Sequence, residues 1–373
     1  MKHIQKQTFK IAKHEIKEHG KIFTIAEAGV NHNGKLDLAL KLVDVAADAG
    51  VDVVKFQTFK AKQVVTDVGE MASYQKKNLG EDKSQVEMLQ ELELKEEFYQ
   101  PIIERCKQRN ILFMSTPHGG VDSVDFLESL NIQAYKIGSG DLTNYLLLKR
   151  VAETGKPIII SVGMATLKEI KSAIKFITDL GNSKIVILQC TTNYPCDLTE
   201  INLAAMETMM NELGMPVGFS DHTQSLEAVT VAALMGMCLY ECHFTIDQSL
   251  PGPDHIASAS PDELKQRIKI IKETEKLNLK EKQEKLAKIS DLKTILGNSI
   301  KKPTKSEAES MLELVRRSLV YKRTLKAGHQ LTLNDLEAKR PGDGISPIQY
   351  QKFIGKKLTS DVKFDQQISE KDF

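Results

Sequence analysis

Two histidines with acidic and hydroxyl neighbours stand at the ends of apolar runs between positions 218 and 255. Ser220 and His222 lie two residues apart, and so do Glu241 and His243. Side chains two apart on a β-strand share one face. If both runs are neighbouring parallel strands, the imidazoles lie at one end of a sheet and predict a metal site with a carboxylate beside it. Two unrelated histidines at strand ends are an equally open alternative at this point.

Two lysines interrupt apolar runs, Lys55 in VVKFQ and Lys136 in AYKIGSG. A buried ammonium group needs a partner, and one interpretation is an ion pair with Glu27 or Asp141. A second is an anion pocket, in which lysines, hydroxyls and glycine-rich turns surround a phosphate and a carboxylate. A third is a Schiff base on Lys136. The hydroxyls of such a pocket would be those of Ser139, Ser161 and Ser220.

The histidine pair favours a divalent cation. Imidazole, carboxylate and water together suit Mn²⁺, Mg²⁺, Co²⁺ or Zn²⁺, and the residues do not choose among them. Such a cation can polarise a substrate carbonyl. Combined with the anion pocket, it suggests a metal-assisted carbon–carbon condensation on a phosphorylated substrate. A Schiff-base enzyme, in contrast, would not need the histidines to hold a metal.

These residues require strands whose ends meet on one face. Strand-like segments alternate with helical ones, which implies parallel strands with helical crossovers. Eight such units predict a closed (β/α)8 TIM barrel, with its active site at the carboxyl ends of the strands. A doubly wound sheet is the alternative, but the turn AGVNHNG after the first strand lacks GxGxxG. The predicted strands span 21–29, 51–57, 111–116, 134–139, 157–161, 185–192, 216–220 and 237–244.

The remaining segments predict how the chain divides. Residues 1–20 are expected to form a cap or hairpin, 21–272 the barrel, 273–316 a Lys/Glu-rich helical linker, and 317–373 a small β domain. Residues 59–93 are too long for a mere connection, and long loops in compact domains are usually functional. The C-terminal segment would be only marginally stable alone and is expected to dock either on its own barrel or on that of a partner subunit.

Composition limits the class of protein. The 51 Lys and Arg balance 50 Asp and Glu, which argues against a general nucleic-acid binder. Five cysteines without paired spacing suit a reducing compartment rather than a disulfide framework. There is neither a signal-peptide pattern nor an apolar run long enough for a membrane span. We therefore expect a cytoplasmic protein without nucleic-acid or membrane partners.

Ten ordered motifs, spread over nearly the whole chain, resemble those of the sialic acid synthase family. Members of this family have a barrel followed by an antifreeze-like (SAF) domain. The resemblance implies that phosphoenolpyruvate condenses with an N-acetylated hexosamine, with release of phosphate by C–O cleavage. The motifs are IAEAGVNHNG, VVKFQTFKA, YQKKN, STP, YKIGSGDLTN, KPIIISVGMATLKEI, LQCTTNYP, GFSDHT, ECHFTIDQSLPGPDH and KRPGDGISP.

The resemblance also implies roles for matching residues. The expected catalytic set is Glu27, Lys55, Lys136 and Asp141. Phosphoenolpyruvate is expected on Lys55, Lys136, Ser139, Ser161, Asn193 and Ser220. The metal, with Mn²⁺ favoured and Mg²⁺ or Co²⁺ as alternatives, is expected on His222, His243 and Glu241. The sugar is expected to meet Gln57, Asn78, Tyr194, Asp254 and Arg340. A domain-swapped homodimer is implied, in which Arg340 reaches the partner's site and binds the sugar's N-acetyl group.

Three positions depart from the family pattern: His118 follows STP where Phe is usual, Cys242 replaces Lys or Arg, and Asp141 stands where some members carry Glu. Strand alternation predicts that Cys242 faces away from the metal. The main functional prediction is N-acetylneuraminate synthesis from N-acetylmannosamine. The alternative is N,N'-diacetyllegionaminate synthesis from a 2,4-diacetamido-2,4,6-trideoxymannose. A Schiff-base aldolase and a non-catalytic carbohydrate-binding protein are more distant alternatives.

Overall fold

The computed structural model describes residues 7–66, 69, 71–79 and 84–373, and its centre is an eight-stranded parallel sheet. The strand order is β5-β4-β3-β10-β9-β8-β7-β6. The two end strands are consecutive in the chain and lie against each other, so the sheet curls into a barrel. This confirms the predicted (β/α)8 barrel. The strands are β3 Phe23–Gly29, β4 Val53–Thr58, β5 Leu112–Pro117, β6 Tyr135–Ile137, β7 Ile158–Ser161, β8 Ile185–Gln189, β9 Val217–Asp221 and β10 Leu239–His243.

Amphipathic helices cover the outside of the barrel. In the first of them, Ala39, Leu42, Val43 and Ala46 recur at helical spacing and are buried, as expected for a helix with one face on a sheet. Gly50 ends that helix in the left-handed region, with φ of 78°. The barrel helices are α1 Leu36–Ala49, α5 Glu96–Gln108, α6 Gly120–Ser129, α7 Tyr145–Glu153, α8 Leu167–Asp179, α9 Ala204–Leu213, α10 Leu226–Leu234 and α11 Pro261–Thr274.

The barrel interior is apolar at one end and polar at the other. A hairpin, β1 Phe9–Ile11 and β2 His14–Ile16, closes the amino-terminal end of the barrel. Its Ile11 and Ile16 are fully buried and pack with strand residues such as Phe23 and Val53. The carboxyl ends of the strands carry buried charged side chains instead. The polar end is therefore where the fold positions a site.

Two excursions from the barrel lie at this polar end. The long loop holds α2 Ala61–Val64, α3 Ser73–Leu79 and α4 Gln85–Glu91. Residues 67–68, 70 and 80–83 of the loop, and 1–6 of the predicted cap, lie outside the described residues. The linker forms α12 Leu279–Leu286 and α13 Leu292–Leu296, then a π-helical turn, Glu307–Met311, that leads into α14 Leu312–Val315. That last helix brings the linker back to the carboxyl face.

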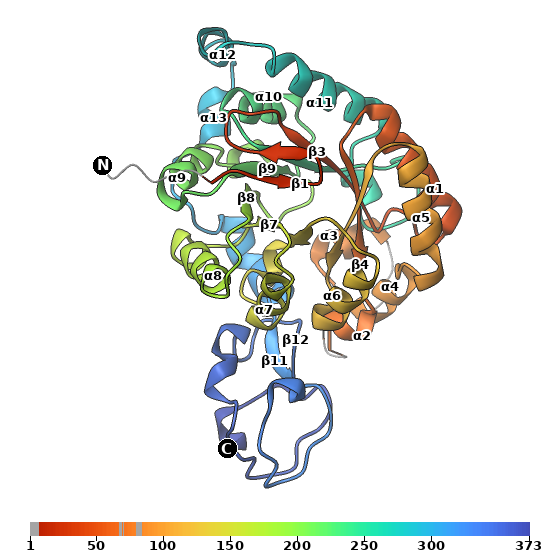
Figure 1. The fold of residues 1–373 in the computed structure, drawn as a ribbon, viewed down its shortest axis with the longest axis vertical. Helices are drawn as coiled ribbons and strands as arrows, with labels where there is room; N and C mark the ends of the chain where they lie inside the picture. The colour runs from red at the N-terminus through yellow and green to blue at the C-terminus, as the bar shows by residue number, and fades with distance from the viewer. Residues whose placement is uncertain (1–6, 67–68, 70, 80–83) are drawn as a thin grey trace.

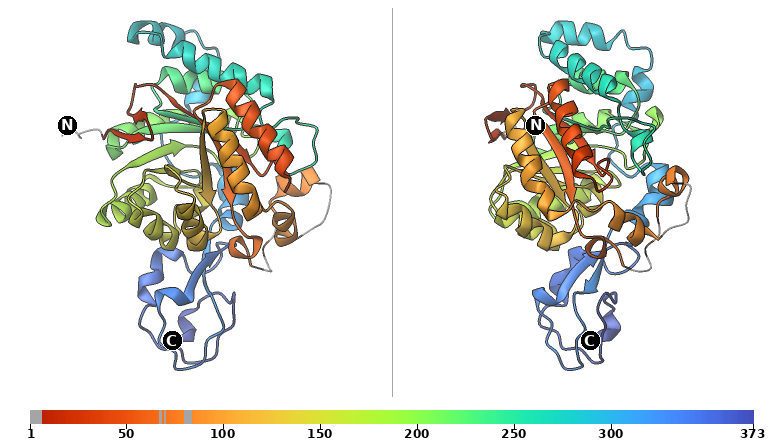
Figure 2. Two further views of the ribbon diagram at one scale, coloured as in Figure 1. Left: turned by 45° about the vertical axis from the view of Figure 1, so that its right-hand side comes forward. Right: turned by 90° about the vertical axis from the view of Figure 1, so that its right-hand side faces the viewer.

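The C-terminal residues form a separate lobe (Figures 1 and 2) on the side of the barrel opposite α12. Two antiparallel strands, β11 Ser318–Tyr321 and β12 Leu336–Lys339, carry its buried core. A short parallel bridge joins Val65 of the loop to Arg340, so the lobe is fastened to the carboxyl face of its own barrel. Every helix in the described part of the chain is too short or too polar to cross a bilayer.

Candidate active site

Four charged side chains form the floor of a pocket at the carboxyl ends of the strands. Lys55 of β4 forms an ion pair with Glu27 of β3. Lys136 of β6 lies 3.2 Å from Glu241 of β10, and Lys55 lies 3.6 Å from the same carboxylate. All four are at most 4% exposed. We call this set the charged floor. Lys55 has the expected partner Glu27, whereas Lys136 pairs with Glu241 and not with Asp141, which pairs with Arg317.

Burial and pairing give the two carboxyls of the charged floor different acidities. Burial raises the pKa of Glu27 to about 7, although Lys55 opposes the shift. Burial also acts on Glu241, but Lys136 and Lys55 outweigh it and lower its pKa to about 2. Environments that separate the pKa values of two carboxyls suit acid–base chemistry. Glu27 is thus the group able to exchange a proton near neutral pH.

Hydroxyl groups surround the lysines. Lys136 donates to Ser161 at 2.7 Å, Lys55 donates to Thr116 at 3.2 Å, and Ser220 donates to Glu241 at 3.0 Å. The backbone N–H of Gly163 points at Ser139 Oγ, 3.0 Å away, and a Cβ at Gly163 would lie 2.3 Å from Thr192 Oγ1. The hydroxyls and lysines expected to surround an anion therefore lie together, and a glycine turn with no room for a Cβ lies beside them. Their binding of an anion remains a prediction.

The two predicted metal-binding histidines lie together, with ring centroids 5.7 Å apart. His222 Nδ1 lies 2.6 Å from the Thr191 carbonyl oxygen, which fixes the proton there and leaves Nε2 as the ligand atom. His243 Nδ1 is buried without a partner in the described chain. Burial lowers the pKa of His243 to about 3 and that of His222 below its ordinary value. Two neutral imidazoles with available nitrogens fit a divalent cation.

The third predicted ligand, Glu241, is engaged by Lys136, Lys55 and Ser220. Within the described ranges, no three His, Cys, Asp or Glu side chains are grouped so as to hold a metal ion. The histidine pair therefore supplies two ligands, and water or substrate would have to complete the coordination. The metal and its three-residue ligand set remain predictions.

The predicted sugar-binding residues are partly gathered at the pocket. Gln57, Tyr194, Asp254 and Arg340 line it, and the Tyr194 ring contacts that of His222 in a tilted arrangement, with 4.2 Å between ring centroids. Burial raises the pKa of Asp254 to about 6. Arg340 lines the pocket of its own chain; the swapped placement in a partner's site remains a prediction.

Two predicted contacts lie outside the described lining of the pocket. Asn78 donates to the carbonyl oxygen of Pro253 at 2.7 Å, and the oxygen of Asn193 accepts from the Tyr194 N–H at 3.1 Å. Both amides thus hold neighbours of the pocket in place. Substrate contacts for these two residues remain predictions.

Asp141, assigned to the catalytic set, is paired with a residue that the sequence did not single out. Arg317 Nε lies 2.6 Å from Asp141 Oδ1, and Asn144 donates to the same oxygen at 3.0 Å. Arg317 also donates to the His118 carbonyl oxygen at 2.6 Å. Its position directly before the apolar segment SLVY is a weak signal for a buried role. Arg317 ties the C-terminal lobe to the ends of β5 and β6.

Apolar side chains form one wall of the pocket, which we call the apolar wall. They come from the long loop and from the linker, not from barrel strands. Sequence reasoning expected the loop to be functional but did not place the linker here. The residues of the apolar wall are Phe59, Val64, Ala72, Met88, Leu89, Leu92, Met311, Leu314 and Val315.

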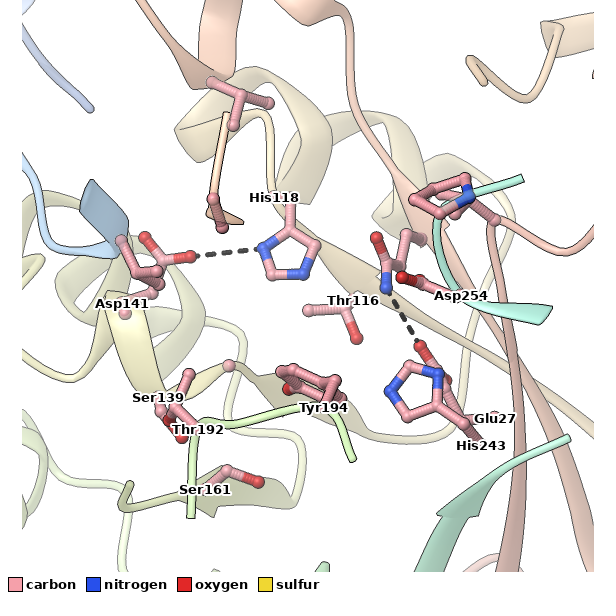
Figure 3. A pocket seen from close by; sticks show the side chains of 18 of the residues that line it. Glu27, Thr116, His118, Ser139, Asp141, Ser161, Thr192, Tyr194, His243 and Asp254 are labelled. Atoms are coloured by element: carbon pink, nitrogen blue, oxygen red, sulfur yellow. Dashed lines mark hydrogen bonds and ion pairs between the residues drawn. The ribbon is translucent and has the colours of Figure 1, made fainter. Parts of the chain in front are cut away.

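Fold and site together define a barrel enzyme with a charged pocket (Figure 3) and a C-terminal lobe that contributes Arg340 to its lining. Comparison with known families gives the particular one. The chain belongs to the NeuB family, which matches residues 42–283, and residues 316–373 match the SAF domain. This confirms the resemblance to the sialic acid synthase family. It also confirms the expected enzyme class, a phosphoenolpyruvate-dependent condensing transferase.

Relatives cover almost the whole chain. An N,N'-diacetyllegionaminic acid synthase of Campylobacter jejuni is 41% identical over 94% of this chain and 99% of its own length. An enzyme of the same name in Legionella pneumophila is 43% identical over 91% of each chain. The crystal structure of the Bacillus subtilis spore coat polysaccharide biosynthesis protein spsE is 31% identical, with a TM-score of 0.82 over 98% of this chain and 99% of that one.

Proposed function

We propose that this enzyme is an N,N'-diacetyllegionaminate synthase. Its substrates would be phosphoenolpyruvate and a 2,4-diacetamido-2,4,6-trideoxymannose. Two relatives of that name, at 41% and 43% identity over nearly the whole chain, support this alternative over N-acetylmannosamine, the sugar first favoured by sequence. The apolar wall supports it as well, because a 6-deoxy sugar with two acetyl groups presents more methyl surface than N-acetylmannosamine does.

The observation that carries the proposal is the charged floor beneath the apolar wall. Lys55 and Lys136 would clamp the phosphate and carboxylate of phosphoenolpyruvate, aided by the hydroxyls around them. As C3 of phosphoenolpyruvate forms a bond to the sugar's aldehyde carbon, the aldehyde C=O π bond opens, its oxygen takes up a proton, and positive charge develops at C2. Water adds at C2, and the C2–O bond to phosphate breaks. Glu27, with its pKa near 7, is suited to take the proton from that water.

A divalent cation would be held by His222 and His243 and would supply Lewis acidity toward the sugar's carbonyl oxygen. Tyr194, whose tilted ring packs against His222, would keep that imidazole oriented. Lys136 acts here as a charge clamp. Its contacts with Glu241 and Ser161 support this role over a Schiff base.

Phosphate release tests the function directly. The purified enzyme is given phosphoenolpyruvate, Mn²⁺ and either the diacetamido sugar or N-acetylmannosamine. We expect kcat/KM to be higher with the diacetamido sugar by at least about tenfold, the effect of one or two apolar contacts. Equal or higher efficiency with N-acetylmannosamine would contradict the assignment. Loss of activity with chelator, restored by Mn²⁺, would support the metal role.

We further propose that the enzyme works in the cytoplasm as a homodimer. The substrates are small phosphorylated and acetamido compounds, and the five cysteines are all free and buried, which suits a reducing compartment. Light scattering would report the mass in solution. A monomer with full activity would contradict the dimer and leave the synthase assignment intact.

A further inference from the structure

His118 is a pocket residue that no step above uses. It follows β5, and its side chain is 18% exposed, against 3% for the adjacent Asp141. The imidazole therefore opens to the pocket while the carboxylate is sealed behind it. Figure 3 shows the His118 ring standing in the pocket, with its contact to Asp141 on one side and Thr116 on the other.

The contacts of His118 assign its tautomer. Nδ1 lies 3.4 Å from Asp141 Oδ2, and Asp141 is ionised because Arg317 pairs with it. A carboxylate only accepts hydrogen bonds, so Nδ1 carries the proton. Burial lowers the pKa of His118 to about 4, although Asp141 opposes the shift, and the ring is neutral at pH 7.

The other nitrogen, Nε2, consequently keeps its lone pair. Within the described chain, the hydrogen bonds of this side chain involve Nδ1 and not Nε2. A ligand group that meets Nε2 must therefore donate a hydrogen bond.

An apolar surface lies next to this acceptor. A Cβ at Gly138 would lie 2.9 Å from His118 Cε1, and a Cβ at Gly140 would lie 2.6 Å from Val315 Cγ1. The imidazole and the Val315 methyl groups thus pack on one glycine turn, two residues apart. Both side chains line the pocket, with Leu314 beside them. The turn offers a slot in which a hydrogen-bond acceptor and an apolar surface are neighbours.

We propose that His118 and Val315 form an acetamido-binding slot for the sugar substrate. Nε2 of His118 accepts from the amide N–H, and the Val315 side chain contacts the acetyl methyl. An acetamido group matches both features because it presents a donor and a methyl together, whereas a hydroxyl presents only the donor. The inference rests on the proposed function, since it assigns the recognition of that same acetamido sugar.

A double-mutant cycle between enzyme and substrate tests the slot. In His118→Asn the amide nitrogen can replace Nδ1 toward Asp141, but the acceptor at the Nε2 position is lost. In His118→Gln an acceptor oxygen can reach the Nε2 position. The substrates are the diacetamido sugar and two analogues in which one amide N–H, at C2 or at C4, is replaced by an ester oxygen.

With the native enzyme we expect one analogue to have a KM about tenfold higher than the diacetamido sugar, the size of one lost hydrogen bond. With His118→Asn, the KM for the diacetamido sugar should rise by the same factor, and the KM for that analogue should not rise any further. His118→Gln should regain most of the affinity. The KM for phosphoenolpyruvate should stay constant throughout, which a merely structural role of His118 would not produce.

His329→Asn is the matched control, because His329 also pairs with an aspartate, Asp335 at 2.9 Å, but in the C-terminal lobe. It should leave both KM values unchanged. If neither analogue binds the native enzyme more weakly, the slot is wrong, whether or not the variants fold. If the native enzyme releases phosphate with none of the sugars, the proposed function itself has failed. If the enzyme is active but the His118 substitution and the change in the analogue affect KM independently, the slot is wrong and the proposed function stands.

Discussion

The charged floor and the apolar wall of the pocket are built by opposite means. Each residue of the floor comes from within a barrel strand, is almost fully buried, and is paired with another charge of the floor. The wall comes from the long loop and the linker and is held by packing. Paired charges can be redirected to an anionic substrate, while apolar side chains select by shape. On the proposed function, the chemistry and the choice of sugar are therefore encoded in different parts of the chain.

The largest expected effect lies in the charged floor. Lys136→Met removes the cation facing Glu241 and one phosphate donor, and we expect kcat/KM for phosphoenolpyruvate to fall by about 10³-fold or more. Lys136→Arg keeps the charge but cannot form a Schiff base. It should retain measurable activity in the same phosphate-release assay. If Lys136→Arg is as inactive as Lys136→Met, and borohydride traps a covalent adduct on the native enzyme, Lys136 does not act as a charge clamp.

Glu27→Gln should cost less, about 10²-fold in kcat, as expected for loss of a general base. Because burial raises the pKa of Glu27 to about 7, activity that needs the carboxylate should rise with pH through about 7 in the native enzyme. The variant should lack this limb of the pH–rate profile. If Glu27→Gln shows the same rise in activity with pH as the native enzyme, that rise belongs to another titrating group.

The raised pKa of Glu27 also predicts that the stability of the folded protein depends on pH. The pKa of Glu27 in the folded state lies above the ordinary value of 4.5, so the native state binds the proton more tightly than the unfolded state does. This contribution is fully present below about pH 4.5 and is lost as pH rises through about 7. The melting temperature of the native protein should fall relative to Glu27→Gln over that range.

A substitution in the apolar wall should have a smaller effect, and it should change the KM for the sugar rather than for phosphoenolpyruvate. Val315→Thr keeps the shape of the side chain but places a hydroxyl where we propose the acetyl methyl lies. We expect the sugar KM to rise about fivefold, the scale of a poorly compensated polar group, with the phosphoenolpyruvate KM unchanged. A shift in both KM values would show that wall and floor are not separable.

The strands and the two buried lysines of the charged floor could be predicted because they follow from local rules, whereas the pairing of Lys136 with Glu241 could not. Alternation of strands and helices gave the barrel, and residues two apart on a strand gave the shared face of Glu241 and His243. Lys55 and Lys136 were visible as charges inside apolar runs. Each of these signals lies within one strand and its turn, so no distant contact had to be known.

The rest depends on contacts between distant segments. Arg317 pairs with Asp141 across 176 positions, and Val315 reaches the pocket from a four-residue helix at the end of a charged linker. No periodicity in the linker indicates which side chain of that helix faces a barrel formed two hundred residues earlier. Asn78 and Asn193 show the converse, because their motifs were recognisable while their side chains bind backbone groups beside the pocket.

The smallest effect is expected at Cys242, which lies between two residues of the pocket on β10. Its thiol faces the helix layer, where Arg267, Asp221 and Tyr240 form a buried cluster, as strand alternation predicted. Cys242→Ala should leave both KM values and the Mn²⁺ dependence within about twofold of native. Removing a small buried side chain should lower the free energy of unfolding by about 1 kcal/mol, measurable by denaturant titration. A changed Mn²⁺ dependence would mean that the two faces of β10 are coupled, and that residues behind the floor also set its chemistry.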